Sequence, residues 1–261
     1  MDKEPNTRPR RLDQQTMRIN RYLALANQGS RRSCEQLVRE GRVQLDGETV
    51  RDLSCRVSPE STVRVDGRIV HPDRNTVVFA LNKPVRFLST ESDPQNRALA
   101  IDLVRPKYSG HLFSVGRLDY LSSGLLLFTN DGDLAQGLMR PETGMDRVYT
   151  VETGAPVSDE ILNQFTRGVT IEGVRYQCRS WHRHAARRIS ITLQEGKNRE
   201  IRRVFTHFRV KIKRIYRTRY GPITLGSLPE GQARQLTTEE VRRLQSALEA
   251  GNRRKKHGRR N

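Results

Sequence analysis

The sequence predicts an α+β protein: a small domain of two helices and short strands, followed by a larger domain with a largely antiparallel mixed sheet. Three observations predict this fold class. Apolar residues near the N-terminus recur at helical spacing and then alternate as in short strands. Asp-Gly pairs, which favour tight hairpin turns, separate those strands. Farther along, hairpin and helix patterns interleave without the regular strand–helix alternation of a parallel sheet.

The first expected domain spans residues 17–75 and follows a polar arm, residues 1–16, that we expect to be disordered. Its first helix begins near Ile19 and ends at Gly29, because glycine commonly terminates a helix. Ser30 is then a suitable N-cap for a second helix. The short strands that follow turn at two Asp-Gly pairs: Asp46-Gly47 and Asp66-Gly67.

The second expected domain spans residues 76–250. Its elements, in order, are a strand at 77–81, a buried strand at 125–128, a helix at 133–139 capped by Asp133, a strand at 148–152, a helix capped by Ser158, a hairpin around Glu172-Gly173, a strand at 189–193 and a helix from about Arg199. Residues 251–261 are basic and carry no acid, so we expect a disordered polycationic tail.

The charge of the chain points to a polyanionic partner. Lys and Arg total 48 against 29 Asp and Glu, a formal net charge of +19. Nucleic acid is the first candidate partner, and an anionic membrane surface is the second. No stretch approaches the length of an apolar membrane span, and the polar N-terminus lacks the apolar core of a signal peptide, so we expect a cytoplasmic protein.

The three cysteines are widely spaced and fit reduced thiols better than a disulfide framework. A cluster of Cys178, His182 and His184 could be argued as metal ligands. No second CxxC or HxxxH pair completes such a site, so we expect no metal.

One segment, residues 114–132, carries the strongest functional signal. Asp119 and Arg117 stand just before the buried strand, where charged groups are costly unless they are paired or used. A strand-end ion pair without chemistry is the alternative. Gly116-Arg117-Leu118-Asp119, Ser123-Gly124-Leu125-Leu126-Leu127 and Thr129-Asn130-Asp131-Gly132 together resemble the signature of ribosomal-RNA pseudouridine synthases, specifically the RsuA/RluB-like branch.

That resemblance implies an isomerase that needs no cofactor. Turning uridine into pseudouridine detaches the base from the ribose, rotates it and rejoins it through carbon 5, with no net redox change. The resemblance implies that Asp119 is the catalytic carboxylate, acting covalently or as a base, and that Arg117 fills the gap left by the flipped base. It also implies that Tyr149 is the active-site tyrosine, and it puts Arg147 and Lys83 among the substrate-binding residues.

Arg86 departs from the family pattern, which usually has glycine at that place. If the position requires a positive φ, Arg86 is strained or the loop differs.

A third segment, residues 195–203, resembles the Gly-x-x-x-Gln-Ile-Arg-Arg pattern of the same family. By that resemblance Arg202 pairs with the catalytic carboxylate and holds it ionised, and Ile201 forms an apolar floor beneath the uracil. Glu200 stands where glutamine is commoner. A carboxylate close to Asp119 would oppose Arg202.

The N-terminal domain resembles the RNA-binding domain of small ribosomal protein S-four. Arginines suit phosphate contact because the guanidinium fork pairs with two oxygens, whereas the alternative is a merely solvated basic surface. The candidate RNA-binding residues are Arg18, Arg21, Arg31, Arg32, Arg39 and Arg42.

We therefore expect a monomeric enzyme that isomerises uridine in ribosomal RNA or a pre-ribosomal particle, with large-subunit RNA favoured over small-subunit RNA. Two alternatives remain open: a non-catalytic RNA-binding assembly factor, and a DNA-binding regulator favoured only by charge.

Overall fold

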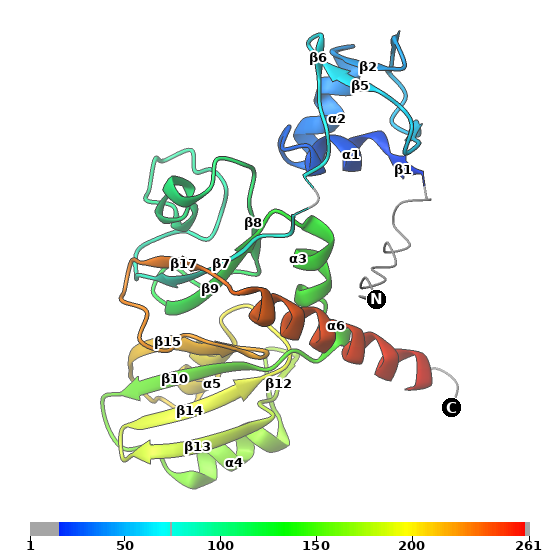
Figure 1. Ribbon diagram of the computed structural model, residues 1–261. Coiled ribbons are helices and arrows are strands. Elements are labelled where there is room, and N and C mark those ends of the chain that lie inside the picture. The colour runs from blue at the N-terminus through cyan, green and yellow to red at the C-terminus, as the bar shows by residue number, and fades with distance from the viewer. Residues whose placement is uncertain (1–15, 74, 259–261) are drawn as a thin grey trace, which may run out of the picture. The chain divides into compact units, whose positions relative to one another are not determined.

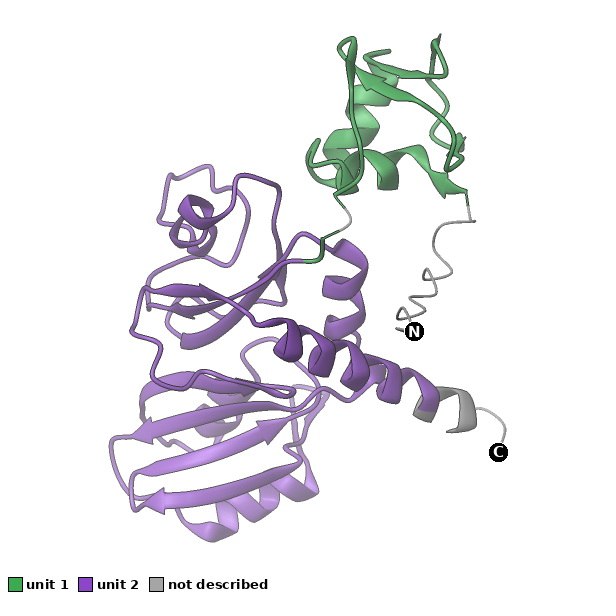
Figure 2. Cartoon of the chain, viewed as in Figure 1, with its two compact units in different colours: residues 1–76 green, residues 77–261 purple. Residues whose placement is uncertain are grey.

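The computed structural model describes residues 16–73 and 75–258, so nearly all of the expected N-terminal arm lies outside the described residues. The chain divides into two compact units, Met1–Thr76 and Val77–Asn261 (Figure 2). Each unit has its own buried apolar cluster, and each is described separately below.

Unit 1 packs two short helices against short strands. Its strands form a four-stranded sheet in the order β3-β2-β5-β6 and a separate β1-β4 pair. The core gathers apolar side chains from both helices and from the strands, including Ile19, Leu23, Val38 and Val63. The elements are β1 (Met17–Arg18), α1 (Ile19–Leu25), α2 (Arg31–Arg39), β2 (Val43–Leu45), β3 (Glu48–Thr49), β4 (Arg56–Val57), β5 (Val63–Val65) and β6 (Arg68–Ile69).

The first helix ends earlier than predicted, because α1 stops at Leu25 rather than at Gly29. The cap and the hairpin turns are present as the sequence predicted. The Ser30 hydroxyl accepts a hydrogen bond from the Ser33 N–H and caps α2. Asp46 and Gly47 both have positive φ, 52° and 95°, which is the backbone of a two-residue type I′ hairpin turn. Asp66 and Gly67 repeat this geometry between β5 and β6.

Unit 2 is built on a nine-stranded sheet whose main path is β13-β14-β10-β15-β9-β7-β17 (Figure 1). All its neighbouring pairs are antiparallel except β15 with β9, which run parallel. The elements are β7 (Val78–Lys83), the 3-10 turns η2 (Ala100–Leu103) and η3 (Arg105–Lys107), β8 (Phe113–Val115), β9 (Ser123–Thr129), α3 (Gly132–Met139), η4 (Pro141–Thr143), β10 (Arg147–Thr153), α4 (Asp159–Arg167), β11 (Val169–Ile171), β12 (Val174–Tyr176), β13 (Ser180–Ala185), β14 (Arg188–Leu193), α5 (Glu200–His207), β15 (Ile212–Tyr220), β16 (Ile223–Thr224), β17 (Ala233–Gln235) and α6 (Thr238–Gly258).

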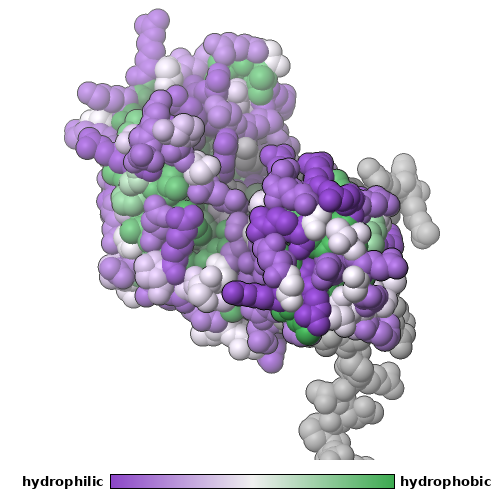
Figure 3. Space-filling model, turned by 90° about the horizontal axis from the view of Figure 1, so that it is seen from above, coloured by the Kyte–Doolittle hydropathy of each residue, from purple (hydrophilic) through white to green (hydrophobic). Residues whose placement is uncertain are grey.

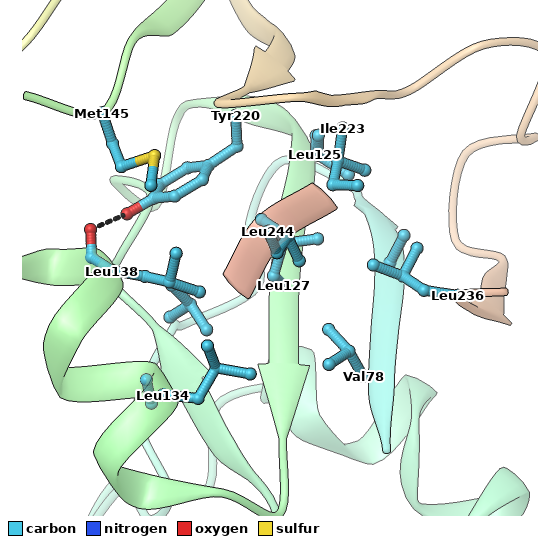
Figure 4. Packing of buried hydrophobic residues seen from close by; sticks show 13 residues of the cluster. Val78, Leu125, Leu127, Leu134, Leu138, Met145, Tyr220, Ile223, Leu236 and Leu244 are labelled. Atoms are coloured by element: carbon cyan, nitrogen blue, oxygen red, sulfur yellow. Dashed lines mark hydrogen bonds between the residues drawn. The ribbon is translucent and has the colours of Figure 1, made fainter. Parts of the chain in front are cut away.

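Helices cover different parts of the sheet on its two faces. On one face, α3 and α6 pack against alternate residues of β7 and β9, and Tyr220 of β15 donates a 2.8 Å hydrogen bond to the Leu138 carbonyl (Figure 4). On the opposite face, α4 and α5 cover β10, β14 and β15, while the η2 region covers β7 and β9. Tyr149 packs against both clusters of this second face, so it marks their junction.

Two details of the secondary structure expected in unit 2 need correction. Helix α3 is capped by Asp131 rather than by Asp133: the Asp131 carboxylate accepts hydrogen bonds from the Asp133 and Leu134 N–H groups. The disordered tail expected from residue 251 is wrong over residues 251–258, which continue α6. Arg and Lys are good helix formers, and Gly251 is buried against the Thr143 carbonyl, so this segment extends a packed helix.

The surface in Figure 3 is predominantly hydrophilic, in line with the excess of charged residues in the chain. Among the helices of the described residues, none has both the length and the apolar character that a bilayer crossing requires.

Candidate active site

Asp119 lies in the connection between β8 and β9, and hydrogen bonds fix the backbone on both sides of it. The Ser89 hydroxyl accepts from the Leu118 N–H at 3.2 Å and donates to the Leu118 carbonyl at 3.1 Å. After the aspartate, the Lys83 ammonium donates to the Ser122 carbonyl at 2.9 Å. The carboxylate is therefore presented from a backbone segment that is anchored before and after it.

Arg86 holds the same connection through its backbone. Its N–H donates to the Tyr120 carbonyl at 2.6 Å. Its φ is +65°, the left-handed region that glycine adopts easily and other residues adopt at a cost. The positive φ considered from the sequence is therefore present, and the chain tolerates a strained arginine beside the site.

Arg202 faces Asp119 from the first turns of α5. Its Nε lies 4.0 Å from Asp119 Oδ2, and its Nη2 donates to the Leu121 carbonyl at 2.7 Å. Burial lowers the pKa of Arg202, and the charge of Asp119 opposes that shift. The Nε itself is shielded from water and has no hydrogen-bond partner among the described residues. The structure thus brings together the two groups that the resemblance paired, with one guanidinium N–H left for a further acceptor.

Tyr149 lies on β10 with its side chain half-buried, next to an arginine that the sequence reasoning missed. Arg217 stands opposite it on β15, and its Nη1 donates to the Tyr149 hydroxyl at 3.4 Å. The guanidinium carbon lies 5.9 Å from the centre of the Tyr149 ring. In the sequence, Arg217 is one of many basic residues after α5. The one signal for it is its position two residues after Ile215, because alternate residues of a strand share a face and Ile215 is buried.

One cleft of about 430 Å³ in unit 2, called here the Asp119 cleft, is lined by Asp119, Tyr149, Arg202 and Arg217. This volume lies within the range of small-molecule sites and can take an extruded base. Ile201 is 5% exposed and contributes apolar surface to the lining, while Arg117 is exposed at the margin. The charged lining residues are mostly basic: Arg117, Asp119, Arg147, Lys197, Arg199, Glu200, Arg202 and Arg217.

Arg147 and Lys83 both donate hydrogen bonds to backbone carbonyls within the protein. Arg147 lines the cleft but is 7% exposed, and its Nη1 donates to the Gln194 carbonyl at 2.7 Å. Lys83 is fully buried outside the lining, where burial lowers its pKa to about 8. The expectation that Lys83 contacts the substrate therefore needs correction: its ammonium is already bonded to the Pro84 and Ser122 carbonyls.

Glu200 is not aimed at Asp119, contrary to the concern raised by the sequence. Its carboxylate accepts hydrogen bonds from the Lys197 N–H at 3.3 Å and the Gln177 N–H at 3.4 Å. The side chain is 3% exposed, and this burial raises the pKa of Glu200 to about 7. Glu200 thus ties the loop before α5 to the segment after β12.

Replacing Glu200 with Gln should change how stability depends on pH. Burial puts the pKa of this carboxyl at about 7 in the folded protein, above its ordinary value of 4.5. The resulting stabilisation is fully present below the unfolded-chain pKa and is lost as pH rises through 7. Glutamine cannot ionise. We therefore expect the Tm of Glu200→Gln, relative to the unchanged protein, to rise by several degrees between pH 5 and pH 8. A pH-independent Tm difference would contradict this assignment.

The six candidate RNA-binding arginines all lie in unit 1, but they differ in exposure and in their ion pairs. Arg18, Arg31, Arg32, Arg39 and Arg42 are exposed, and Arg21 is half-buried. Arg42 forms a two-point ion pair with Asp66, with contacts of 2.6 and 2.9 Å. Arg39 approaches Glu35 at 3.8 Å. Such exposed pairs are weak and exchange readily for phosphate.

Within residues 16–73 and 75–258, no three His, Cys, Asp or Glu side chains gather as potential metal ligands. Cys178 is buried against Thr166, whereas His182 and His184 lie on exposed positions of β13. The alternative metal cluster is therefore not assembled.

The sequence and fold of the chain match those of known proteins. Residues 77–207 match the family model for RNA pseudouridylate synthases, and residues 17–63 match the S4 domain. A crystal structure of a pseudouridylate synthase superposes with a TM-score of 0.64 at 24% identity, covering 87% of this chain and 99% of that one. This likeness supports the fold.

Relatives in sequence extend over most of the chain. An RNA pseudouridine synthase of Borreliella burgdorferi is 36% identical over 236 residues, covering 89% of this chain and 94% of that protein. The ribosomal large subunit pseudouridine synthase B of Bacillus subtilis is 32% identical over 240 residues, covering 90% and 98%. The dual-specificity RNA pseudouridine synthase RluF of Escherichia coli K12 is 34% identical over 233 residues, covering 88% and 79%. With its Asp119 cleft and these matches, the chain belongs to the RNA pseudouridine synthase family.

Proposed function

We propose that this protein isomerises uridine to pseudouridine in ribosomal RNA, with large-subunit RNA as the favoured substrate. The observation that carries the proposal is the Asp119 carboxylate beside Arg202, in a cleft that Tyr149 also lines and whose charged residues are mostly basic. The name of the Bacillus subtilis relative supports the large-subunit preference. A monomer acting in the cytoplasm, without a cofactor, completes the proposal.

The cleft supplies the groups that the reaction requires. A uridine swung out of its stack would enter with its ribose toward Asp119, and Ile201 offers an apolar surface for the base. The Asp119 carboxylate can attack the ribose carbon or remove a ribose proton, and both routes free the base for rotation. The Arg202 guanidinium places a positive charge 4.0 Å from this carboxylate.

The main test is a map of pseudouridine in ribosomal RNA from cells with and without this gene. Complementation with the unchanged gene should restore at least one missing pseudouridine, while complementation with Asp119→Asn should not. Restoration by Asp119→Asn would contradict the assignment. An unchanged pseudouridine map in the gene-free cells would leave the non-catalytic assembly factor as the better reading.

Removal of residues 1–76 should separate docking from chemistry. Unit 2 keeps its own apolar clusters without unit 1, so we expect the shortened protein to unfold cooperatively. Loss of the unit 1 arginines removes phosphate contacts, so KM for a ribosomal RNA transcript should rise at least ~10-fold while kcat stays within a few-fold. A kcat that falls as much as the affinity would contradict a purely docking role for unit 1.

A further inference from the structure

Arg217 is a buried cation with an unused hydrogen-bond donor at the Asp119 cleft. It is 2% exposed, and its Nε donates to the Leu125 carbonyl at 2.7 Å. Its Nη1 lies 3.4 Å from the Tyr149 hydroxyl, as described above. The remaining nitrogen, Nη2, is shielded from water and has no hydrogen-bond partner among the described residues. Arg217 lines the cleft, so a molecule held there is the natural source of the missing acceptor.

This arrangement carries a desolvation cost. The guanidinium lies over the Tyr220 ring, 5.1 Å from its centre, which compensates part of the lost hydration. The Nη2 N–H groups themselves still lack an acceptor among the described residues. A second buried cation, Lys83, lies nearby: burial lowers its pKa, Asp119 opposes that shift, and the charge of Arg217 adds to it. Asp119 and Glu200 are the only acids in the lining as described, against six basic side chains. The excess of basic side chains in the cleft lining therefore favours binding of a negatively charged group.

The proposed reaction generates such a charge on the base. When the bond between ribose C1′ and uracil N1 breaks, its electron pair stays on the base and spreads over N1, O2 and O4. The charge is consumed when C5 bonds to C1′. The C5 proton then leaves to a base or to water, and N1 takes up a proton, so that the product has the same atoms as the substrate. A fixed donor positioned before the reaction stabilises such transient charge most effectively in a water-poor site.

We propose that Arg217 is a catalytic residue whose Nη2 donates to a carbonyl oxygen of the target uracil and stabilises the negative charge that develops on the detached base. This rests on the proposed function. Tyr149 can assist in this role. An arginine can only donate, so the tyrosine oxygen is the acceptor in their contact, and the hydroxyl proton is free to point elsewhere.

Three variants test this role of Arg217. They distinguish the effect of its charge from that of its hydrogen-bond geometry and from the effect of losing any basic residue. Arg217→Met removes the charge and the donors at similar length, and Arg217→Lys keeps the charge without the fork. Arg188→Met is the matched control, because Arg188 is an exposed arginine on β14 of the same sheet, outside the cleft lining. We expect Arg217→Met to slow single-turnover tritium release by about 10²-fold, Arg217→Lys to be intermediate, and Arg188→Met to stay within about two-fold.

An atom-specific cycle then distinguishes a substrate contact from a structural role. Transcripts carry the mapped target nucleotide as uridine, 2-thiouridine or 4-thiouridine, since sulfur is a weaker acceptor than oxygen. One of the two thio substitutions should lower the rate of the unchanged enzyme. The same substitution should not lower the rate of Arg217→Met any further, because that variant has already lost the hydrogen bond. Equal slowing of both enzymes by both substitutions would overturn the proposal, as would an Arg217→Met rate within about three-fold of the unchanged enzyme.

If Arg217→Met does not fold, the same cycle with Arg217→Lys decides by the same criterion. Failure of this inference is distinguishable from failure of the proposed function. An unchanged enzyme that releases no tritium from any uridine transcript contradicts the function, whereas an active enzyme without the Arg217–carbonyl coupling contradicts only the inference.

Discussion

Asp119→Asn is expected to abolish turnover while leaving RNA affinity within a few-fold. Asparagine has nearly the same shape but cannot act as a nucleophile or a base toward the ribose, so the rate should fall by about 10³-fold or more. Binding should persist because phosphate contacts, spread over many Lys and Arg, dominate affinity. Single-turnover tritium release and filter binding on the same transcript measure the two quantities separately.

Asp102→Asn is the matched control for that experiment. It makes the same chemical change at an exposed aspartate of η2, which pairs with Arg105 outside the cleft lining. We expect a rate within two-fold of the unchanged enzyme. An Asp119→Asn enzyme that turned over at the rate of this control would remove Asp119 from the mechanism.

Gly124→Ala is expected to have the largest effect on stability and to damage the site as well. Gly124 has φ +100°, and a Cβ there would lie 2.4 Å from the carbonyl oxygen and 2.5 Å from the backbone nitrogen of Arg217. These are backbone atoms of the parallel β9–β15 pair, so the strands themselves would have to separate. We expect a loss of about 3 kcal/mol or more in the free energy of unfolding, measured by denaturant titration.

Gly173→Ala provides the control for backbone strain alone. Gly173 lies in the β11–β12 turn with φ +76°, and a Cβ there would meet no described atom within 4 Å. It should cost only about 1 kcal/mol, the price of a positive φ in a residue with a side chain. Equal losses in the two variants would show that the close approach of Gly124 to Arg217 carries no special weight.

Elements governed by neighbouring residues were predictable from the sequence. The Ser30 cap and the Asp46-Gly47 turn depend on chemistry within a few residues, and both are present. The cap of α3 was assigned two residues too late. Asp131 and Asp133 are both good capping residues, and the backbone conformation decides between them. The helix beyond residue 250 was missed because its stability comes from packing of its earlier turns, which composition does not reveal.

Features that join distant parts of the chain were not predictable. The parallel pairing of Gly124 with Arg217 joins positions separated by about half of unit 2, and no local pattern indicates it. The role of Arg217 depends on that pairing, so it was hidden among the other arginines of β15. The position of Glu200 was misjudged for a related reason. Sequence places it two residues from Arg202, but the helix turns it toward Gln177 instead of Asp119.

Tritium release from carbon 5 of uridine tests the central claim most directly, because it reports the rearrangement of the base itself. Purified enzyme is incubated with C5-tritiated transcripts that together span the large- and small-subunit ribosomal RNAs. The arrangement of Asp119, Tyr149 and Arg202 predicts release that rises to an integral number of tritium atoms per target transcript, with the large-subunit RNA as substrate. No release from any transcript, with a folded enzyme that binds the RNA, would contradict it.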